Sequence, residues 1–473
     1  MTRRVPSHLT RGTLVVLTLV ASLGASEPTA MPEVGDEVRL RGDLTLDDAL
    51  KTALVSNRTL QATVEERDVA RGRVLEAWGE ALPKLTADAA FNRTDDVTAF
   101  EIEGRRIAFG TLNTYSAGLT VEQPIFRGGA TMAALRAARL YRSLTDETVR
   151  AAVQGTIYHA AADYYRVVLL AKQLEVAQHY FELTAAHLKD VETKRRFGVA
   201  SDFNVLRAQV ERSNAEVEKI AIKNQLDAAR ASLFRTLGVS QDSDARLSTG
   251  LDYQPLVVDE AAAVDEALAR RPDLIASGHT VGLREQAVTA AKSDYWPNVD
   301  ATFRYGWARP DPYSPMRDEW GPAWRLSVSA RYPLFDGLRR EGRVMQARAA
   351  LRKSRIEYDD AHQQVLFEVR TALQTLENAT QAVEAQELTL EQASEGLRIA
   401  EVSYREGTLD QVSVLDARNA LTQAQLFYVR SLHAHAMAKL ELWRATGVLS
   451  PAKVLSPDSD GPAADPMAES PKR

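Results

Sequence analysis

The sequence predicts an α+β membrane protein in which one module, made of long antiparallel coiled-coil helices and a β-hairpin, occurs twice. The corner Pro124-Ile125-Phe126-Arg127-Gly128 returns as Pro333-Leu334-Phe335-Asp336-Gly337, and 333 − 124 = 209. Each corner precedes a proline-free run of about 69 residues and follows segments in which apolar and polar residues alternate. A repeat of this size is a whole supersecondary module rather than one unit of a solenoid.

The bulk composition is that of a folded protein and excludes several classes of partner. Of the 473 residues, 45% are hydrophobic and 26% are charged, and the net charge is −6. This charge provides no basic field for nucleic acid. Because the chain has no cysteine, we expect neither disulfides nor a lipid-anchored N-terminal cysteine.

Residues 1–26 are predicted to be a secretory signal peptide. The apolar run 13–24 follows the arginines Arg3, Arg4 and Arg11 and precedes the small residues Ala25 and Ser26. The run is too short to cross a bilayer, and no other stretch approaches the ~18 apolar residues of a transmembrane helix. The alternative is a basic leader without structure.

The module boundaries follow from the prolines, the glycines and the hydrophobic pattern. Repeat 1 is predicted over 27–239, with a helix over 45–82, a β-hairpin over 85–126, a long helix over 128–196 and a return helix over 203–237. A linker follows over 240–261. Repeat 2 is predicted over 262–448, with a helix over 262–296, a β-hairpin over 299–335, a long helix over 337–405 and a return helix over 411–446. The polar tail 449–473 is expected to be disordered.

The strand pairs have the pattern of a sheet with one apolar and one polar face. Over 299–307 the odd positions are Val, Ala, Phe, Tyr and Trp, and the even positions are Asp, Thr, Arg and Gly. Each strand is about as long as the ~9–11 residues that cross a bilayer when tilted. The connections 92–112 and 308–324 are long and polar, which suits an outer-membrane barrel. The alternative is a half-exposed hairpin in a soluble sandwich.

The two long helices favour the membrane interpretation. About 69 residues of helix extend for roughly 100 Å, more than a globular core needs. Heptads run through both, and in the second they comprise Val365, Val369, Ala372, Leu376, Ala379, Val383, Leu390, Ala393, Leu397 and Ala400. Such spacing predicts coiled-coil packing. A cytosolic coiled-coil rod would explain neither the signal peptide nor the strand pairs.

Four strands from one chain cannot close a barrel, because the smallest lipid-spanning barrels have about eight. An open sheet edge is not tolerated in hydrocarbon. Two copies would supply eight strands filled by side chains, and three would supply twelve, enough for a lumen. We therefore predict a homo-oligomeric conduit.

These features together resemble the TolC-like outer-membrane efflux proteins. The resemblance covers about 43–448 and rests on the duplicated corner, the turn from Tyr404 to Gly407, and Val414-Leu415-Asp416-Ala417-Arg418 at the start of the return helix. It implies a homotrimer whose strands form a shared 12-stranded barrel in outer-membrane lipid, continued by a periplasmic α-helical barrel. It also implies two partners, a periplasmic adaptor and an inner-membrane pump.

The resemblance further implies a gate at the periplasmic end. Tyr404 and Asp416 match two of the family's gate positions, whereas Leu409 stands at an Arg position and Ser413 and Asn204 stand at Asp positions. The family's ionic latch therefore does not carry over as a set, and Leu409 is expected to form an apolar constriction instead. The alternatives are coiled-coil packing for Tyr404 and a solvated helix face for Asp416.

The two turns, 197–204 and 404–411, are the expected docking sites for the adaptor. Glycine suits the end of a helix, and Ser, Thr or Asp suits the start of the next. The residues concerned are Phe197, Gly198, Ser201, Asp202, Gly407, Thr408 and Asp410.

Motifs for catalysis or cofactor binding are not found in the sequence. It has no phosphate-binding Gly-x-x-x-x-Gly-Lys-Ser/Thr loop and no Gly-x-Ser-x-Gly elbow. His433 and His435 are two apart on a helix and face different directions, so they make a poor metal pair. We therefore predict no catalytic residue, metal or cofactor. The leading function is a passive exit duct of a tripartite efflux or type I secretion system, and the alternative is a secreted coiled-coil structural or surface protein without a pore.

Overall fold

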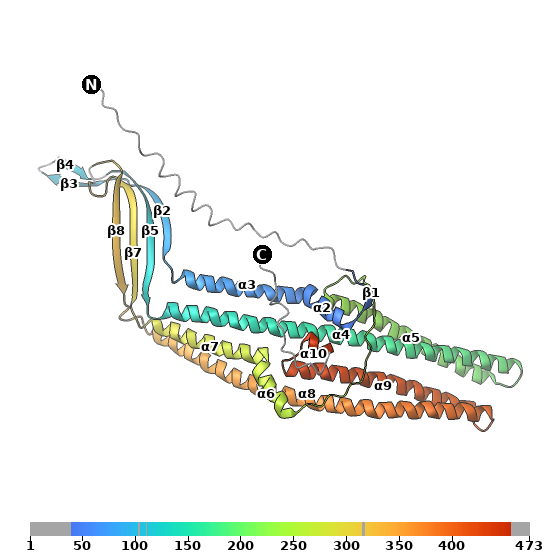
Figure 1. The fold of residues 1–473 in the computed structure, drawn as a ribbon. Helices are drawn as coiled ribbons and strands as arrows, with labels where there is room; N and C mark the ends of the chain where they lie inside the picture. The colour runs from blue at the N-terminus through green and yellow to red at the C-terminus, as the bar shows by residue number, and fades with distance from the viewer. Residues whose placement is uncertain (1–38, 103–104, 110, 315–316, 456–473) are drawn as a thin grey trace.

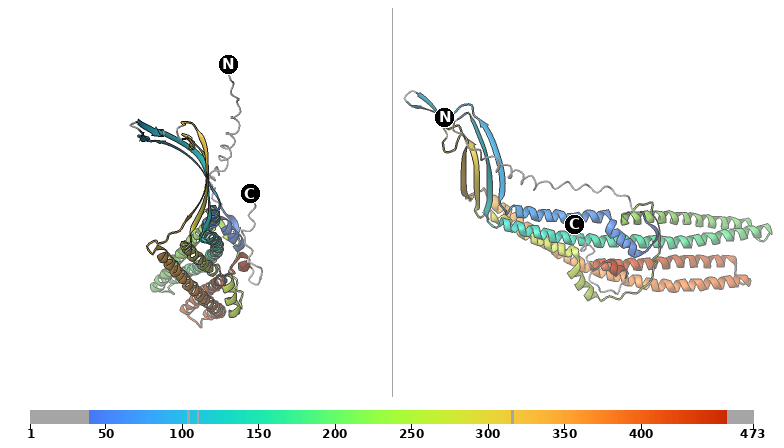
Figure 2. Two further views of the ribbon diagram at one scale, coloured as in Figure 1. Left: turned by 90° about the vertical axis from the view of Figure 1, so that its left-hand side faces the viewer. Right: turned by 45° about the horizontal axis from the view of Figure 1, so that its top comes forward.

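The computed structural model describes residues 39–102, 105–109, 111–314 and 317–455. The expected signal peptide 1–26 lies outside them. A curved β-sheet stands at one end of the molecule, and long helices lead from it to two helix turns at the other end (Figure 1). The strands bend away from the helix axes, as Figure 2 shows from two further directions.

The sheet contains four antiparallel strands in the order β2-β5-β7-β8. They are β2 (Lys84–Arg93), β5 (Asn113–Arg127), β7 (Asn298–Arg309) and β8 (Gly321–Arg331). Each repeat contributes one hairpin, and the pairing of β5 with β7 joins the two hairpins. Within the described chain, β2 and β8 are therefore open edges.

The two faces of the sheet differ in polarity, as the alternation predicts. On one face Arg304 of β7 reaches over β5 to form an ion pair with Asp88 of β2. It passes Gly118, where a Cβ would lie 3.1 Å from the carbonyl oxygen of Tyr305. The opposite face carries aromatic pairs such as Phe303 and Trp324, whose ring centres are 6.4 Å apart.

The helices form four columns side by side (Figure 1). Two columns are the continuous helices α4 (Ala130–Arg196) and α8 (Arg339–Arg405), of 67 residues each. Each of the other two consists of two shorter helices placed end to end. One column is α3 (Arg58–Gly79) with α5 (Asp202–Leu237), and the other is α7 (Pro272–Ser293) with α9 (Gln411–Ala445). The internal repeat is thus visible in three dimensions.

The element boundaries repeat with the offsets found in the sequence. From α4 to α8 the offset is 339 − 130 = 209, and from α3 to α7 it is 272 − 58 = 214. The five-residue difference falls within the strand region, where the first hairpin has the longer connection.

The predicted heptads face the core along most of their length. In α8 the residues Val365, Val369 and Val383 are buried. In α4 the heptad residues Ile157, Ala160, Tyr164 and Val167 are buried, but farther along the heptad is replaced by a different buried series, Ala177, Thr184 and Val191.

The helices predicted over 45–82 and 262–296 are each broken in two. The structure has α2 (Leu46–Ser56) before α3, and α6 (Glu260–Arg270) before α7. At the first break Asn57 caps α3, because its Oδ1 accepts from the backbone N–H of Leu60 at 2.8 Å. At the second break Pro272 occupies the first helical position, where its missing N–H is not needed. The apolar periodicity continues across both breaks and conceals them.

The segment 240–261 is structured rather than an open linker. Its strand β6 (Asp244–Leu247) pairs in parallel with β1 (Arg41–Leu44). The buried hydroxyl of Tyr164 donates to the carbonyl of Leu44 and accepts from the N–H of Thr249, both at 2.9 Å. This small sheet is therefore fastened to the middle of α4.

The tail and the first polar connection also depart from expectation. The prediction of disorder is wrong for 449–455, because Leu449 and Val454 are buried and the helix α10 (Pro451–Leu455) forms there. Residues 456–473 lie outside the described chain. Within 92–112 the strands β3 (Thr98–Ile102) and β4 (Arg105–Phe109) pair with each other. The alternating Phe and Ile residues in that segment were the missed strand signal.

The joint between α5 and α3 leaves no room for a side chain at Gly238. Gly238 has φ +75°, and a Cβ there would lie 2.0 Å from the carbonyl oxygen of Ser56. Asn57 Nδ2 also donates to the carbonyl of Thr236 at 2.7 Å, which ties the two helix ends together.

We expect Gly238→Ala to be strongly destabilising. The left-handed backbone alone costs about 1–2 kcal/mol for a non-glycine residue, and the clash with Ser56 adds to it. Gly198→Ala is the matched control, because Gly198 has φ +73° with nothing within 4 Å of the added Cβ. Thermal unfolding of both variants measures the difference. Equal losses would show that the joint is not closely packed.

The second joint, where the end of α9 meets the start of α7, contains a buried charge. Arg271, with its side chain 10% exposed, forms ion pairs with Asp273 at 2.6 Å and Glu368 at 2.5 Å. Burial acts to raise the pKa of both carboxyls, but hydrogen bonds and the Arg271 charge outweigh it, so both pKa values are lowered.

Stability should therefore fall on acidification. A carboxyl whose pKa is lowered by folding stabilises the protein above its unfolded pKa, and this stabilisation is lost as pH falls through the folded value. We expect Glu368→Gln to unfold more easily than the wild type at pH 7, with the difference shrinking below about pH 4. Urea unfolding at several pH values measures this. A pH-independent difference would contradict the assignment.

Candidate functional site at the helix turns

The two turns at the end of the helices have the same construction. In the first, Gly198 has φ +73° and the N–H of Val199 donates to the carbonyl of Lys194 at 2.9 Å. In the second, Gly407 has φ +77° and the N–H of Thr408 donates to the carbonyl of Ser403 at 3.0 Å. Both are six-to-one helix ends for which glycine is the preferred residue.

Both return helices begin with a side-chain cap. Ser201 accepts from the N–H of Asn204, and Asp410 accepts from the N–H and the hydroxyl of Ser413 at 3.0 and 2.6 Å. Both bonds lower the pKa of Asp410, and the bond from the Ser413 hydroxyl has the larger effect. Two of the predicted gate residues, Asn204 and Ser413, are therefore the residues whose N–H groups are capped, and Ser413 also donates its hydroxyl to Asp410.

The two helical hairpins, α4 with α5 and α8 with α9, are joined near their turns by Lys194 and Tyr404. Lys194 Nζ, on α4, donates to the hydroxyl of Tyr404, on α8, at 3.1 Å. Asp190 holds the same ammonium group at 2.8 Å. The hydrogen bond to Asp190 and then the one to Tyr404 raise the pKa of Lys194, so the group stays charged. Tyr404 thus makes a polar contact between hairpins rather than plain coiled-coil packing.

A second polar contact lies farther from the turns. Gln411 Nε2, at the start of α9, is 3.1 Å from His187 Nδ1 on α4. Burial is the main effect on His187 and lowers its pKa, which favours the neutral ring.

The other predicted residues of the turns lie at the surface. Asp416 is exposed, and Leu409 is half-buried. The exposed docking candidates are Phe197, Gly198, Ser201, Asp202, Gly407, Thr408 and Asp410. The first turn is the more apolar, because Phe197 is 80% and Val199 77% exposed. Asp202 also forms an ion pair with Arg195, which ties the start of α5 to the end of α4.

Sequence reasoning missed Lys194, His187 and Gln411. Lys194 belongs to a run of basic residues at the end of α4, where positive charge is ordinarily explained by the helix dipole. Its partner is 210 residues away in the chain. The repeat could have indicated the contact, since it places α4 and α8 in register.

The described ranges contain no assembled metal site. No group of three or more His, Cys, Asp or Glu residues is placed to hold a metal ion in that part of the chain. His435 is buried, and its ring lies 5.1 Å from that of Tyr253.

Among the residues that the structure describes, none of the helices is both long and apolar enough to span a bilayer.

The family model for outer membrane efflux proteins matches residues 49–239 and 263–448. The chain belongs to the outer membrane efflux protein family. The two matched stretches correspond to the two repeats, which are separated by β6 and the start of α6. Membership of the family assigns this efflux protein to the outer membrane.

Curated relatives support the assignment over nearly the whole chain. Outer membrane protein OprJ of Pseudomonas aeruginosa is 23% identical over 417 residues, covering 86% of this chain and 84% of the relative. Alkaline protease secretion protein AprF of the same species is 24% identical and covers 86% and 85%. Outer membrane protein TolC of Escherichia coli is 22% identical and covers 85% and 82%.

Solved structures share the fold. The Campylobacter jejuni CmeC outer membrane channel superposes with a TM-score of 0.76 at 15% identity, covering 87% of this chain and 88% of that one. CusC superposes with a TM-score of 0.74 at 20% identity, covering 86% and 92%. At these identities the likeness shows the fold alone.

Proposed function

We propose that this efflux protein is the passive exit duct of a tripartite efflux or type I secretion system, formed by three copies. The observation that carries the proposal is a four-stranded sheet with two open edges, continued by a helical layer with two apolar edges. Three copies would give twelve strands, enough for a lumen. The polar face of the sheet, with Asp88 and Arg304, would then line the channel, and the aromatic face would meet lipid.

The two outer columns of the helical layer, α3 with α5 on one side and α8 on the other, support ring closure. Each of them exposes a stripe of apolar side chains. The stripes comprise Phe203, Leu206, Val210, Val217 and Ile220 on α5, and Met345, Ile356, Phe367, Leu388 and Ile399 on α8. Exposed apolar surface of this extent is typical of an interface.

The internal repeat also predicts how the open sheet edges would pair. In one chain β5 pairs with β7, with Leu119 opposite Tyr305. Applying the offsets of 209 and 214 to this pair sets Val328 of β8 opposite Phe91 of β2 in the next copy. Both residues are exposed in the single chain, Val328 by 66% and Phe91 by 58%.

The gate would lie at the helix turns. Lys194 and Tyr404 tie the first hairpin to the second within each copy, and Leu409 would narrow the opening from the second turn. Asp416, exposed on α9, would add negative charge near the opening. The family's ionic latch is replaced here by one hydrogen bond and one apolar residue.

The turns themselves would receive a periplasmic adaptor, which connects the duct to an inner-membrane pump. They are exposed, and Phe197 and Val199 give the first turn an apolar tip. Energy coupling would belong to the pump, because this chain lacks a phosphate-binding loop and any set of catalytic residues in its sequence.

The curated relatives are named for different cargoes. Relatives of similar identity bear names as different as alkaline protease secretion protein and toluene efflux pump outer membrane protein. The proposal therefore assigns the choice of cargo to the pump and not to the duct.

Single-channel recording of the purified protein in planar lipid bilayers tests the proposal. We expect discrete conductance steps that require the full-length chain. Protein that binds the bilayer but never conducts would instead favour a surface coiled-coil protein without a pore.

A further inference from the structure

The joint between α9 and α7 is closed by two side chains of α4. Gln154 Nε2 donates to the carbonyl of Gly447 at 2.6 Å. Tyr158 packs against Arg444, whose guanidinium carbon lies 4.9 Å from the ring centre. These contacts fasten the first repeat onto the second within one chain.

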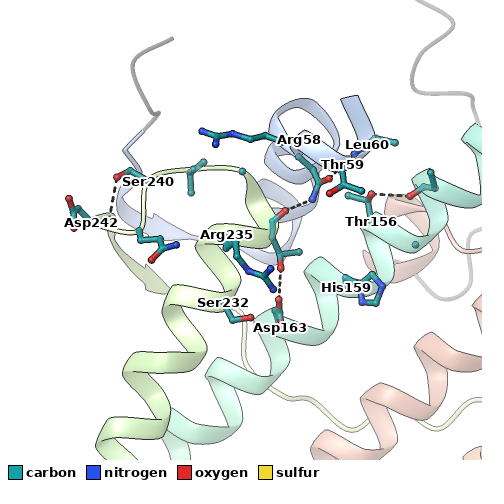
Figure 3. A pocket seen from close by; sticks show the side chains of 17 residues that line it. Arg58, Thr59, Leu60, Thr156, His159, Asp163, Ser232, Arg235, Ser240 and Asp242 are labelled. Atoms are coloured by element: carbon teal, nitrogen blue, oxygen red, sulfur yellow. Dashed lines mark hydrogen bonds between the residues drawn. The ribbon is translucent and has the colours of Figure 1, made fainter. Parts of the chain in front are cut away.

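The equivalent joint, between α5 and α3, opens into a hollow of about 800 Å³. Figure 3 shows Ser232 and Arg235 on the α5 side, and Thr156 and His159 on the α4 side. The repeat relates the two joints, because 444 − 209 = 235 and 447 − 209 = 238. Arg235 and Gly238 therefore correspond to Arg444 and Gly447. At the α5–α3 joint, however, no described helix of the same chain occupies the place that Gln154 and Tyr158 of α4 take at the α9–α7 joint.

The helix α8 carries the side chains that would fill the hollow. At the same offset, Gln363 corresponds to Gln154 and Phe367 to Tyr158. Both are exposed in the single chain, Phe367 by 64%. An exposed phenylalanine at the level of an open joint is what a contact between copies requires.

Two further residues differ between the joints in a matched way. Burial and then the nearby carboxylate of Glu441 on α9 raise the pKa of the Tyr158 hydroxyl. Where α8 has Phe367, which lacks that hydroxyl, α5 has Ser232 in place of the glutamate, since 441 − 209 = 232. The arginine, which needs only an aromatic face, is kept in both joints.

We propose that Phe367 and Gln363 of one copy close the α5–α3 joint of the next copy. Phe367 packs under Arg235, and Gln363 Nε2 donates to the carbonyl of Gly238. This proposal rests on the ring of copies proposed above and names the contact that closes it. The hollow is then a socket that is complete only in the assembly.

A cross-linking experiment tests the contact directly, because the chain contains no cysteine. The variant Phe367→Cys with Arg235→Cys is treated with a short bismaleimide in detergent. The matched control is Tyr158→Cys with Arg444→Cys, which has the same geometry within one chain. We expect the first pair to give covalent dimers and trimers on denaturing gels, and the control pair to give a looped monomer.

The outcomes separate this proposal from the one on which it rests. A trimeric protein whose first pair yields only monomers, while the control pair reacts, overturns the contact and leaves the duct standing. A wild-type protein that is monomeric by mass overturns both.

A second variant covers the case in which the cysteine pair fails to assemble. Benzoylphenylalanine in place of Phe367 keeps an aromatic ring and should, on irradiation, join a peptide from 232–241 of another chain. Adducts elsewhere, or only within the same chain, contradict the proposal.

Discussion

Phe303→Arg is expected to abolish the assembled pore. Phe303 lies in the middle of β7 on the apolar face of the sheet, where it packs near Trp324. An arginine on the lipid face near the bilayer midplane costs about 2–4 kcal/mol, and a ring of three copies carries three of them. We expect loss of the oligomer from detergent-purified protein, measured by mass, and loss of conductance in bilayers.

Thr302→Arg is the matched control, since it places the same charge one residue away on the opposite face. Thr302 lies opposite Glu122 of β5, on the face that carries Asp88 and Arg304. There the arginine is expected to leave assembly intact and to shift ion selectivity toward anions. If Thr302→Arg destroyed the oligomer and Phe303→Arg did not, the assignment of lipid and lumen faces would be reversed.

Tyr404→Phe is expected to open the periplasmic end. It removes the hydroxyl that accepts from Lys194 and links the two hairpins. Such a hydrogen bond contributes about 1 kcal/mol, so three copies together change the ratio of closed to open states on the order of 100-fold. Single-channel recording should show a higher open probability, and Lys194→Met should act in the same way and not additively.

Tyr180→Phe is the control for this change. The Tyr180 hydroxyl donates to Glu211 at 3.2 Å within the first hairpin, so its loss does not separate the hairpins. Leu409→Ser tests the apolar constriction separately and should raise conductance. Unchanged recordings for both Tyr404→Phe and Leu409→Ser would remove these residues from the gate.

Much of the architecture follows from repetition and periodicity in the sequence. The corners at Pro124 and Pro333 give the offset that α4 and α8 obey residue for residue, and alternation identifies the polar face of β7. The caps at Ser201 and Asp410 are equally local, because a side chain bonds to an N–H three residues on. Such features depend on neighbours in the chain and can therefore be predicted from it.

Features that depend on distant neighbours could not be predicted in the same way. The breaks at Asn57 and Arg271 arise because helices from other parts of the chain end there, at Gly238 and Gly447. The partner of Tyr404 is Lys194, which no local pattern marks. Ser413 stands at a gate position where the family has Asp, yet its hydroxyl bonds to Asp410, so a position in a family pattern does not fix a role.

Electron microscopy of the detergent-purified full-length protein tests the central claim most directly. Class averages viewed down the long axis should show a ring with threefold symmetry around an open centre, and side views should show a rod with helices of roughly 100 Å. Particles with the mass of one chain, and with the edges of β2 and β8 covered by the chain itself, would contradict the account.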